Sequence, residues 1–355
     1  MSGAISNGFG IMPSLMRTID KLNAQNDALT TETATGIAAS SYAGLGDQAY
    51  EAISLEPQIS ATVAWQSNLT QTQTKLAVTQ TALTGISAIA TSLQTSLLNL
   101  GTSSSPADIA AASNAAKSEL TQLTGLLNTQ SGNLYVFAGT ASDQAPVSTS
   151  DLATSSLVTG IMNAVAQVGT AGATATESAT LASASDNNAA GSVFSTQLSV
   201  AASTAATLVP QIPVGQSESL STGIVATQGS PATADSTGSA IRDLIRSLAT
   251  VAGMADADSG STAFQSLLSD TSSGMSGITQ GLTGLTASVG TLQDNATSIG
   301  SNLSDLNDVL TSQLGNVKDS DLATTRTQQV AVQNQLTASY TLIADMKTLN
   351  LAQYL

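Results

Sequence analysis

Apolar residues recur in steps of three and four along an uninterrupted stretch near the C-terminus. The stretch runs from Met275 to Val317 and includes Leu282, Leu285, Val289, Leu292, Ile299, Leu303, Leu306 and Leu310. An average spacing of 3.5 residues is typical of the seam of a left-handed coiled coil. At about 1.5 Å per residue, a helix over 275–317 would be roughly 65 Å long, far longer than an average globular helix. We therefore predict a rod helix here.

A second seam lies nearer the N-terminus. It comprises Leu69, Leu76, Leu83 and Leu97, which recur at multiples of seven, and Leu93 on the adjacent stripe. The pattern predicts that the two long helices pair lengthwise. Gln66 lies between Leu55, which begins this seam, and Leu69, and Gln73 and Gln80 lie between the later leucines. They either fix the register through hydrogen bonds or face solvent, because an unpaired amide is costly inside a bundle.

Shorter apolar stripes occur at the two ends of the chain. The N-terminal stripe is Met12, Leu15, Ile19, Leu22 and Leu29, and the C-terminal one is Leu336, Ile343, Met346, Leu349, Leu351, Tyr354 and Leu355. Apolar side chains gathered at a terminus indicate an interface that covers them. We predict that both stripes are assembly interfaces, with an intramolecular core helix as the alternative for the C-terminal one.

Turn residues divide the chain between these helices. We expect the first helix to end near Gly36, the next to start near Ala49, and Ser105 or Asp108 to cap the following one. The Ser/Thr/Ala/Gly composition of 141–238 is typical of disorder. Its apolar residues, among them Leu157 and Ile161, favour instead a small β-rich domain.

The predicted fold class is mainly α, a long antiparallel coiled-coil helical bundle built from both termini with a small β-rich central domain. We expect five segments: an N-terminal assembly helix and loop (1–45), rod helices (46–140), a variable outward-facing β-rich domain (141–238), further rod helices (239–317) and a C-terminal assembly helix (318–355).

Composition narrows the function classes. The chain has no Cys and no His, which excludes a zinc site of those ligands, a Cys nucleophile and a Ser-His-Asp triad. Its scattered carboxylates indicate no enzyme, and we expect no cofactor and no metal. A net charge of −15 argues against nucleic-acid binding, which needs clustered basic residues. We expect neither a cleaved signal peptide nor a membrane span, because polar residues interrupt every apolar stretch.

The order of several short motifs resembles the flagellin family, which includes the flagellar filament subunit and the hook-filament junction protein. The motifs are Leu29 to Gly36 leading into the loop 42–47, Gln66-Ser67-Asn68, residues 133–140, Asp321-Leu322-Ala323 and the helix ending at 349–355. The resemblance covers residues 1 to about 140 and about 235 to 355. The motif at 135–140 and the ending Tyr354-Leu355 are more similar to the junction protein.

The resemblance implies a function outside the cell. Members are exported unfolded by the flagellar secretion apparatus without a cleaved signal, and their terminal helices fold on assembly into an inner tube. The implied partners are copies of the chain itself, other flagellar axial proteins such as hook-associated proteins and the cap, and an export chaperone that binds the C-terminal helix. We expect a filament flagellin used in swimming motility, with the junction protein as the alternative. A different secreted coiled-coil or adhesin-like protein is a more remote one.

Overall fold

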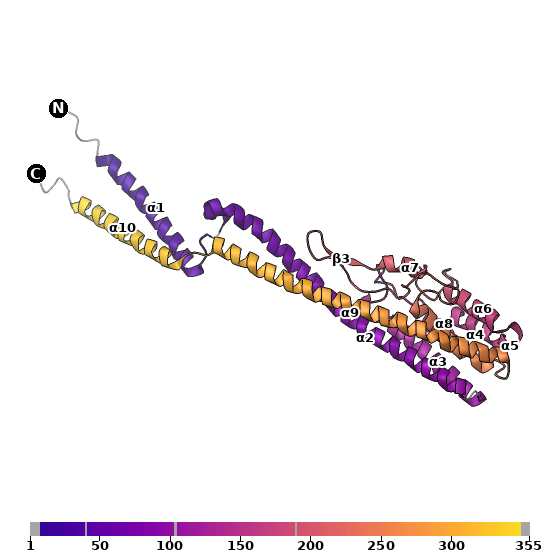
Figure 1. The fold of residues 1–355 in the computed structure, drawn as a ribbon. Helices are drawn as coiled ribbons and strands as arrows, with labels where there is room; N and C mark the ends of the chain where they lie inside the picture. The colour runs from indigo at the N-terminus through magenta and orange to yellow at the C-terminus, as the bar shows by residue number, and fades with distance from the viewer. Residues whose placement is uncertain (1–7, 40, 103–104, 189, 349–355) are drawn as a thin grey trace, which may run out of the picture. The chain divides into compact units, whose positions relative to one another are not determined.

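The computed structural model describes residues 8–39, 41–102, 105–188 and 190–348, and it is mainly helical (Figure 1). Five helices account for most of its length. They are α1 (Gly8–Thr35), α2 (Ala49–Thr102), α3 (Pro106–Leu127), α9 (Thr262–Lys318) and α10 (Leu322–Thr348).

Shorter elements lie between α3 and α9. The helical ones are η2 (Leu152–Thr154), α4 (Ser156–Ala166), α5 (Val168–Ala171), α6 (Ala173–Ser185), α7 (Ala202–Ala205), η3 (Ala206–Leu208), α8 (Ala240–Gly253) and η4 (Met254–Asp256). A further turn of 3₁₀-helix, η1 (Tyr42–Gln48), precedes α2. Two antiparallel hairpins pair β1 (Gln130–Ser131) with β2 (Leu134–Tyr135) and β3 (Gln211–Pro213) with β4 (Ser219–Ser221).

The chain divides into two compact units. Unit 1 comprises 1–63 and 304–355, and unit 2 comprises 64–303. The dividing points fall inside α2 and α9, away from the boundaries expected at 45, 140, 238 and 317. The five expected segments stay predictions.

Unit 2 contains the main hydrophobic core. The stripe from Leu76 to Leu100 on α2 meets α3 through Leu120 and Leu123, and it meets α9 through residues between Met275 and Val289. Helix α8 completes the core with Ile241, Leu244 and other side chains that are fully buried. Its start is fixed by Ser239, whose side-chain oxygen accepts a hydrogen bond from the Arg242 amide.

A second cluster lies further along the same two helices. Leu69 of α2 groups there with Ala296 and Leu303 of α9. Leu220 of β4 and Val214, which follows β3, belong to the same cluster. The hairpin therefore covers the long helices at this level.

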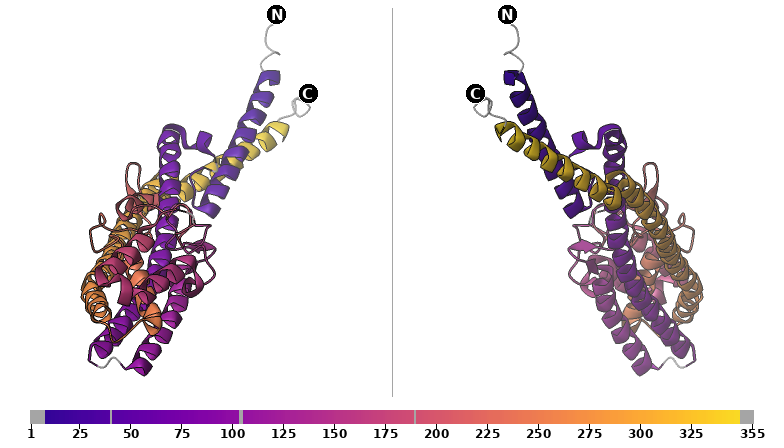
Figure 2. Two further views of the ribbon diagram at one scale, coloured as in Figure 1. Left: turned by 90° about the vertical axis from the view of Figure 1, so that its right-hand side faces the viewer. Right: turned by 90° about the vertical axis from the view of Figure 1, so that its left-hand side faces the viewer.

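Unit 1 contains α1 and α10, which lie side by side (Figures 1 and 2). They run in opposite directions, because Thr30 contacts Gln329 whereas Asn23 contacts Tyr340. The expected ends are confirmed: α1 ends at Thr35, and Gly36 follows with a φ of 72°, a conformation that glycine adopts without strain.

The expectation of a β-rich central segment is wrong. The described part of 141–238 contains α4, α5, α6 and α7, and its β-structure is limited to the hairpin β3–β4 and isolated bridges such as Val147 with Phe194. Leu157, Ile161, Val165 and Val168 are buried, and their spacing of four, four and three puts them on one side of a helical stretch. The spacing was a helix signal inside a composition that looked irregular.

One helical stretch of the described residues, Tyr42–Gly101, is long and apolar enough to cross a membrane by length and composition alone. Of its most apolar window, 44% is buried inside the chain, and Leu83, Leu93 and Leu97 of α2 belong to the main core. Core helices of this kind pass the same test.

Candidate assembly surfaces

Helices α1 and α10 are joined by one narrow apolar seam. Ile19, Leu29, Val332 and Leu336 are buried in it, and Leu15, Leu22 and Ile343 are partly buried against them. Polar contacts flank the seam, with the Gln329 side chain donating to the Thr30 hydroxyl at 2.8 Å. A single stripe on each helix is enough for a two-helix contact and leaves the other faces uncovered.

The seam includes most of the assembly residues expected from sequence. Leu15, Ile19, Leu22, Leu29, Leu336 and Ile343 meet each other within one chain. Met12 and Met346 belong to α1 and α10, but their side chains lie outside the described part, as do Leu349, Leu351, Tyr354 and Leu355 altogether. The use of these positions between subunits stays a prediction.

Further large apolar side chains are exposed on the same two helices. Met16, Leu322, Val330, Tyr340 and Leu342 are each between 50% and 55% exposed. None of these five side chains belongs to the apolar seam that joins α1 to α10. A helix pair with apolar residues on more than one face indicates further burial against a partner.

Exposure of apolar side chains is concentrated in unit 1. Of the fourteen exposed large hydrophobic residues in the described part, twelve belong to unit 1, and only Leu98 and Leu134 belong to unit 2. The twelve include Tyr50 at 83% and Ile53 at 51% near the start of α2, and Val309 at 53% near the end of α9. In the described part, unit 2 buries most of its large apolar residues, whereas unit 1 leaves many of them exposed.

Most residues of the rod seam expected from sequence are buried, whereas their pairing as a coiled-coil seam stays a prediction. Leu69, Leu76, Leu83, Leu93, Leu97, Leu282, Leu285, Val289, Leu303 and Leu310 are buried, and Leu292 and Ile299 are partly buried against the clusters of unit 2. Leu306 is the exception, because its side chain is 43% exposed. In the part of α9 from Leu303 to Lys318, the buried residues are Leu303, Leu310 and Val317. The seam there is one stripe spaced by seven, and Leu306 lies beside it.

The α2 seam contains threonines as well as leucines. Thr62, Thr72 and Thr79 are buried at positions that continue the heptad pattern of the leucines. The Thr79 hydroxyl donates to the Lys75 carbonyl of its own helix at 2.8 Å, and Thr62 does the same to Gln58 at 2.9 Å. A threonine whose hydroxyl is satisfied locally presents its methyl group to the seam.

The three seam glutamines, Gln66, Gln73 and Gln80, are all half-buried. The side-chain oxygen of Gln80 is buried and has no hydrogen-bond partner among the described residues. This oxygen therefore neither faces solvent nor fixes the register by a hydrogen bond within the described part of the chain.

Hydroxyl groups on the outer faces of the long helices are also satisfied locally. Thr70 donates to the Gln66 carbonyl, Thr283 to Thr279 and Thr337 to Gln333, at 2.8 to 3.0 Å. With only 9% charged residues in the chain, these faces expose methyl groups and weak acceptors rather than charges. Identical copies can approach such a surface without bringing like charges together.

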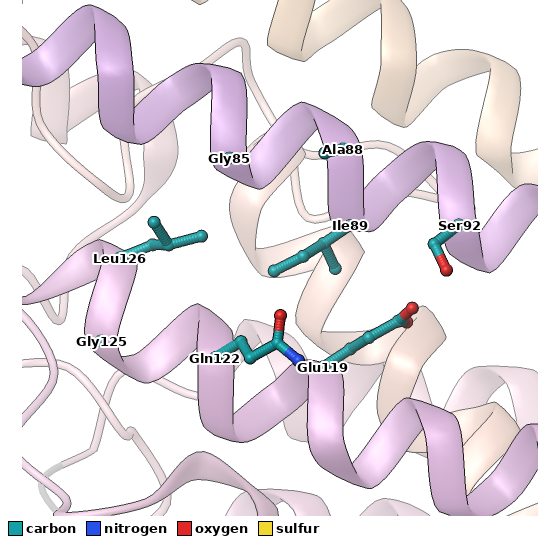
Figure 3. Close-up of a pocket in the computed structure, with 8 residues that line it drawn as sticks. All are labelled: Gly85, Ala88, Ile89, Ser92, Glu119, Gln122, Gly125 and Leu126. Atoms are coloured by element: carbon teal, nitrogen blue, oxygen red, sulfur yellow. The ribbon is translucent and has the colours of Figure 1, made fainter.

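One surface hollow of about 740 Å³ lies between α2 and α3. Figure 3 shows Ile89 and Leu126 directed into the space between the helices, and Glu119 directed toward Ser92. Burial raises the pKa of Glu119, although a hydrogen bond from Ser92 opposes the shift. Glu119 is the single titratable residue among the eight that line the hollow, so no pair of acid and base groups meets there. The described residues also contain no group of three or more Asp or Glu placed to hold a metal ion.

No protein-family model matches the chain, and no curated protein matches it. Among solved structures, the fold is similar to that of a protein from Vibrio parahaemolyticus provisionally described as flagellar hook-associated. That similarity has a TM-score of 0.51 at 14% sequence identity, and it covers 76% of this chain and 96% of the other. At this identity the likeness concerns the fold.

Proposed function

We propose that the chain is a structural subunit that assembles with other copies into the bacterial flagellar filament through unit 1. The observation that carries this proposal is the concentration of exposed large apolar side chains on unit 1. Their burial between subunits would supply the driving force, at about 25 cal/mol per Å² before the entropy of ordering is subtracted. Contacts between different faces of identical subunits generate open filaments when the rotation does not close a ring.

Several features support this function. The packing of α2 on α9 in clusters along shared stripes fits an antiparallel coiled-coil rod. The weakly charged helix faces suit a polymer of identical units. As a flagellin-like subunit, the chain would be exported by the flagellar secretion apparatus, guided by a chaperone on its C-terminal helix, and would meet other axial proteins outside the cell. Its terminal helices would become more fully ordered on assembly.

The second candidate is the junction between hook and filament. Two observations favour it: the solved protein of similar fold is provisionally named for hook association, and residues 135–140 are similar to the junction protein's motif. A junction protein would add a short segment to an existing hook end instead of forming long filaments.

Electron microscopy of purified protein tests the two candidates. The intact chain and a variant truncated after Lys347 are incubated with sheared filament fragments or isolated hooks as seeds. A filament flagellin elongates fragments into long tubes, and a junction protein adds only short segments to hooks. We expect the truncated variant to do neither, because it lacks the apolar residues Leu349, Leu351, Tyr354 and Leu355.

Equal growth by the intact and truncated chains would contradict the role of the C-terminal residues. An intact chain that stays monomeric with every seed would contradict the proposed function.

A further inference from the structure

Two connecting segments of unit 1 bind each other through their backbones. One segment follows α1 and the other joins α9 to α10. The Ala38 amide donates to the Lys318 carbonyl at 2.7 Å, and the Ser320 amide donates to the Gly36 carbonyl at 2.9 Å. Ile37 and Asp319 form an antiparallel bridge between these bonds. The end of α1 and the start of α10 are therefore fixed at one point.

Charged and polar side chains close this crossing on the side of α2. Glu56 of α2 uses both carboxylate oxygens: one accepts from the Lys318 ammonium and the other from the Tyr42 hydroxyl of η1. The Lys318 ammonium also lies 5.4 Å from the centre of the Tyr42 ring. Tyr42, Glu56 and Lys318, which we name the clasp, thus join three elements in a closed triangle.

A second carboxylate connects α1 to α10 on the other side. Glu32, near the end of α1, accepts from the Ser320 hydroxyl and from the Thr325 hydroxyl, the latter at 2.8 Å. Lys318 takes part in two of these contacts. Its carbonyl accepts from the Ala38 amide of the first connecting segment, and its ammonium donates to Glu56 of α2.

We propose that the clasp is a salt-sensitive device that couples the order of the α1–α10 pair to the ends of α2 and α9, and so controls assembly. The control of assembly rests on the proposed function, whereas the coupling does not. The Lys318 and Glu56 side chains are 31% and 40% exposed, so salt reaches the ion pair and screens it. The Glu56 hydrogen bond raises the pKa of Lys318, in agreement with the geometry.

Hydrogen exchange of the backbone amides tests the coupling without assembly. Peptides that cover 36–42 and 318–322 report the bonds of Ala38 and Ser320. In Lys318→Met these peptides should exchange about two- to fivefold faster than in the native chain at about 0.01 M salt, with little difference at about 1 M. Lys21→Met, an exposed site on α1, makes the same change in net charge and should exchange like the native chain. The double variant Glu56→Lys, Lys318→Glu should recover protection.

The same variants in the seeded growth assay test the control of assembly. Lys318→Met should raise the protein concentration needed for growth at low salt, and Lys21→Met should not. The coupling is overturned if Lys318→Met and Lys21→Met exchange alike, or if both peptides exchange as in an unfolded chain in free and assembled protein. A native chain that shows the coupling but never grows on any seed contradicts the proposed function alone.

Discussion

At the scale of single residues, Arg242 is the most deeply buried charge described. Its side chain is 4% exposed, and its guanidinium donates to the carbonyls of Leu198 and Val200 and to the Asn187 amide oxygen at 3.0 to 3.2 Å. It also lies 5.2 Å from the Phe194 ring centre. Burial lowers the pKa of Arg242 to about 10, so it is charged at neutral pH. It connects α8 to the irregular chain after α6.

Replacing this guanidinium should destabilise unit 2. Arg242→Lys keeps the charge but cannot reach the same acceptors, and we expect a loss of about 2–4 kcal/mol in the free energy of unfolding. Arg246→Lys on the same helix is the control, because Arg246 is half-buried and donates two hydrogen bonds, to the Thr180 hydroxyl and the Asp235 carbonyl. Urea unfolding of both variants measures the difference. Equal midpoints would show that the buried hydrogen bonds of Arg242 contribute nothing specific.

The rod seam offers a second comparison between residues. Leu76→Ala removes a fully buried side chain and should cost about 2–5 kcal/mol. Thr79→Val, three residues away, removes a hydroxyl that bonds only its own helix, and we expect a change below about 1 kcal/mol. Urea unfolding midpoints distinguish the two. A large loss in Thr79→Val would mean that its hydroxyl has a partner across the seam.

At the scale of elements, α9 carries glycines with opposite environments. A Cβ at Gly284 would meet nothing within 4 Å, whereas a Cβ at Gly281 would lie 2.6 Å from the Ala240 Cβ at the start of α8. Gly284→Ala should therefore raise stability by about 0.5–1 kcal/mol through helix propensity. Gly281→Ala should lower it, because α8 must shift. Thermal unfolding of the pair measures this, and a gain in both variants would contradict the close contact of α8 with α9.

The contacts between the connecting segments of unit 1 should weaken at low pH and at very high pH. A hydrogen bond from Lys318 lowers the pKa of Glu56 below 4.5. A hydrogen bond from the Thr324 hydroxyl lowers the pKa of Asp321 below 3.8. Their contribution to order is therefore present above these values and is lost as pH falls through the lowered pKa. The pKa of Lys318 is raised above 10.5, so its contribution is lost only in strong alkali.

Hydrogen exchange of the peptides 36–42 and 318–322, corrected for the intrinsic pH dependence, measures this response. We expect constant protection from about pH 5 to pH 9 and a loss below about pH 4. In Glu56→Gln the loss of protection in acid should be smaller, because one of the two titrating carboxyls is absent. Protection that does not change in acid would contradict a role for these carboxylates.

The accuracy of the sequence prediction differs between elements for physical reasons. The long helices were predictable because heptad spacing and caps such as Ser105, whose side chain accepts from the Asp108 amide at 3.2 Å, are local signals. The central segment was predicted wrongly because its composition favours neither helix nor strand. The bridges of Val147 and Ala138 to residues far away in the sequence depend on tertiary packing, which local patterns do not show. Leu306 and the uncovered faces of α10 could not be assigned, because exposure depends on which neighbours a helix finds.

At the scale of the whole molecule, the two units differ in how much of their apolar surface they bury. Unit 2 buries a large core built from α2, α3, α8 and α9. Among its described residues, unit 1 has one narrow seam and twelve exposed large apolar residues. Stability should therefore reside in unit 2 and association in unit 1.

Sedimentation velocity of the intact chain and of the fragment 64–303, each with and without seeds, tests this division most directly. We expect the fragment to be a folded monomer under every condition, with helical circular dichroism and a cooperative unfolding transition, while the intact chain grows on seeds. A folded fragment that assembles as readily as the intact chain would contradict the assignment of association to unit 1.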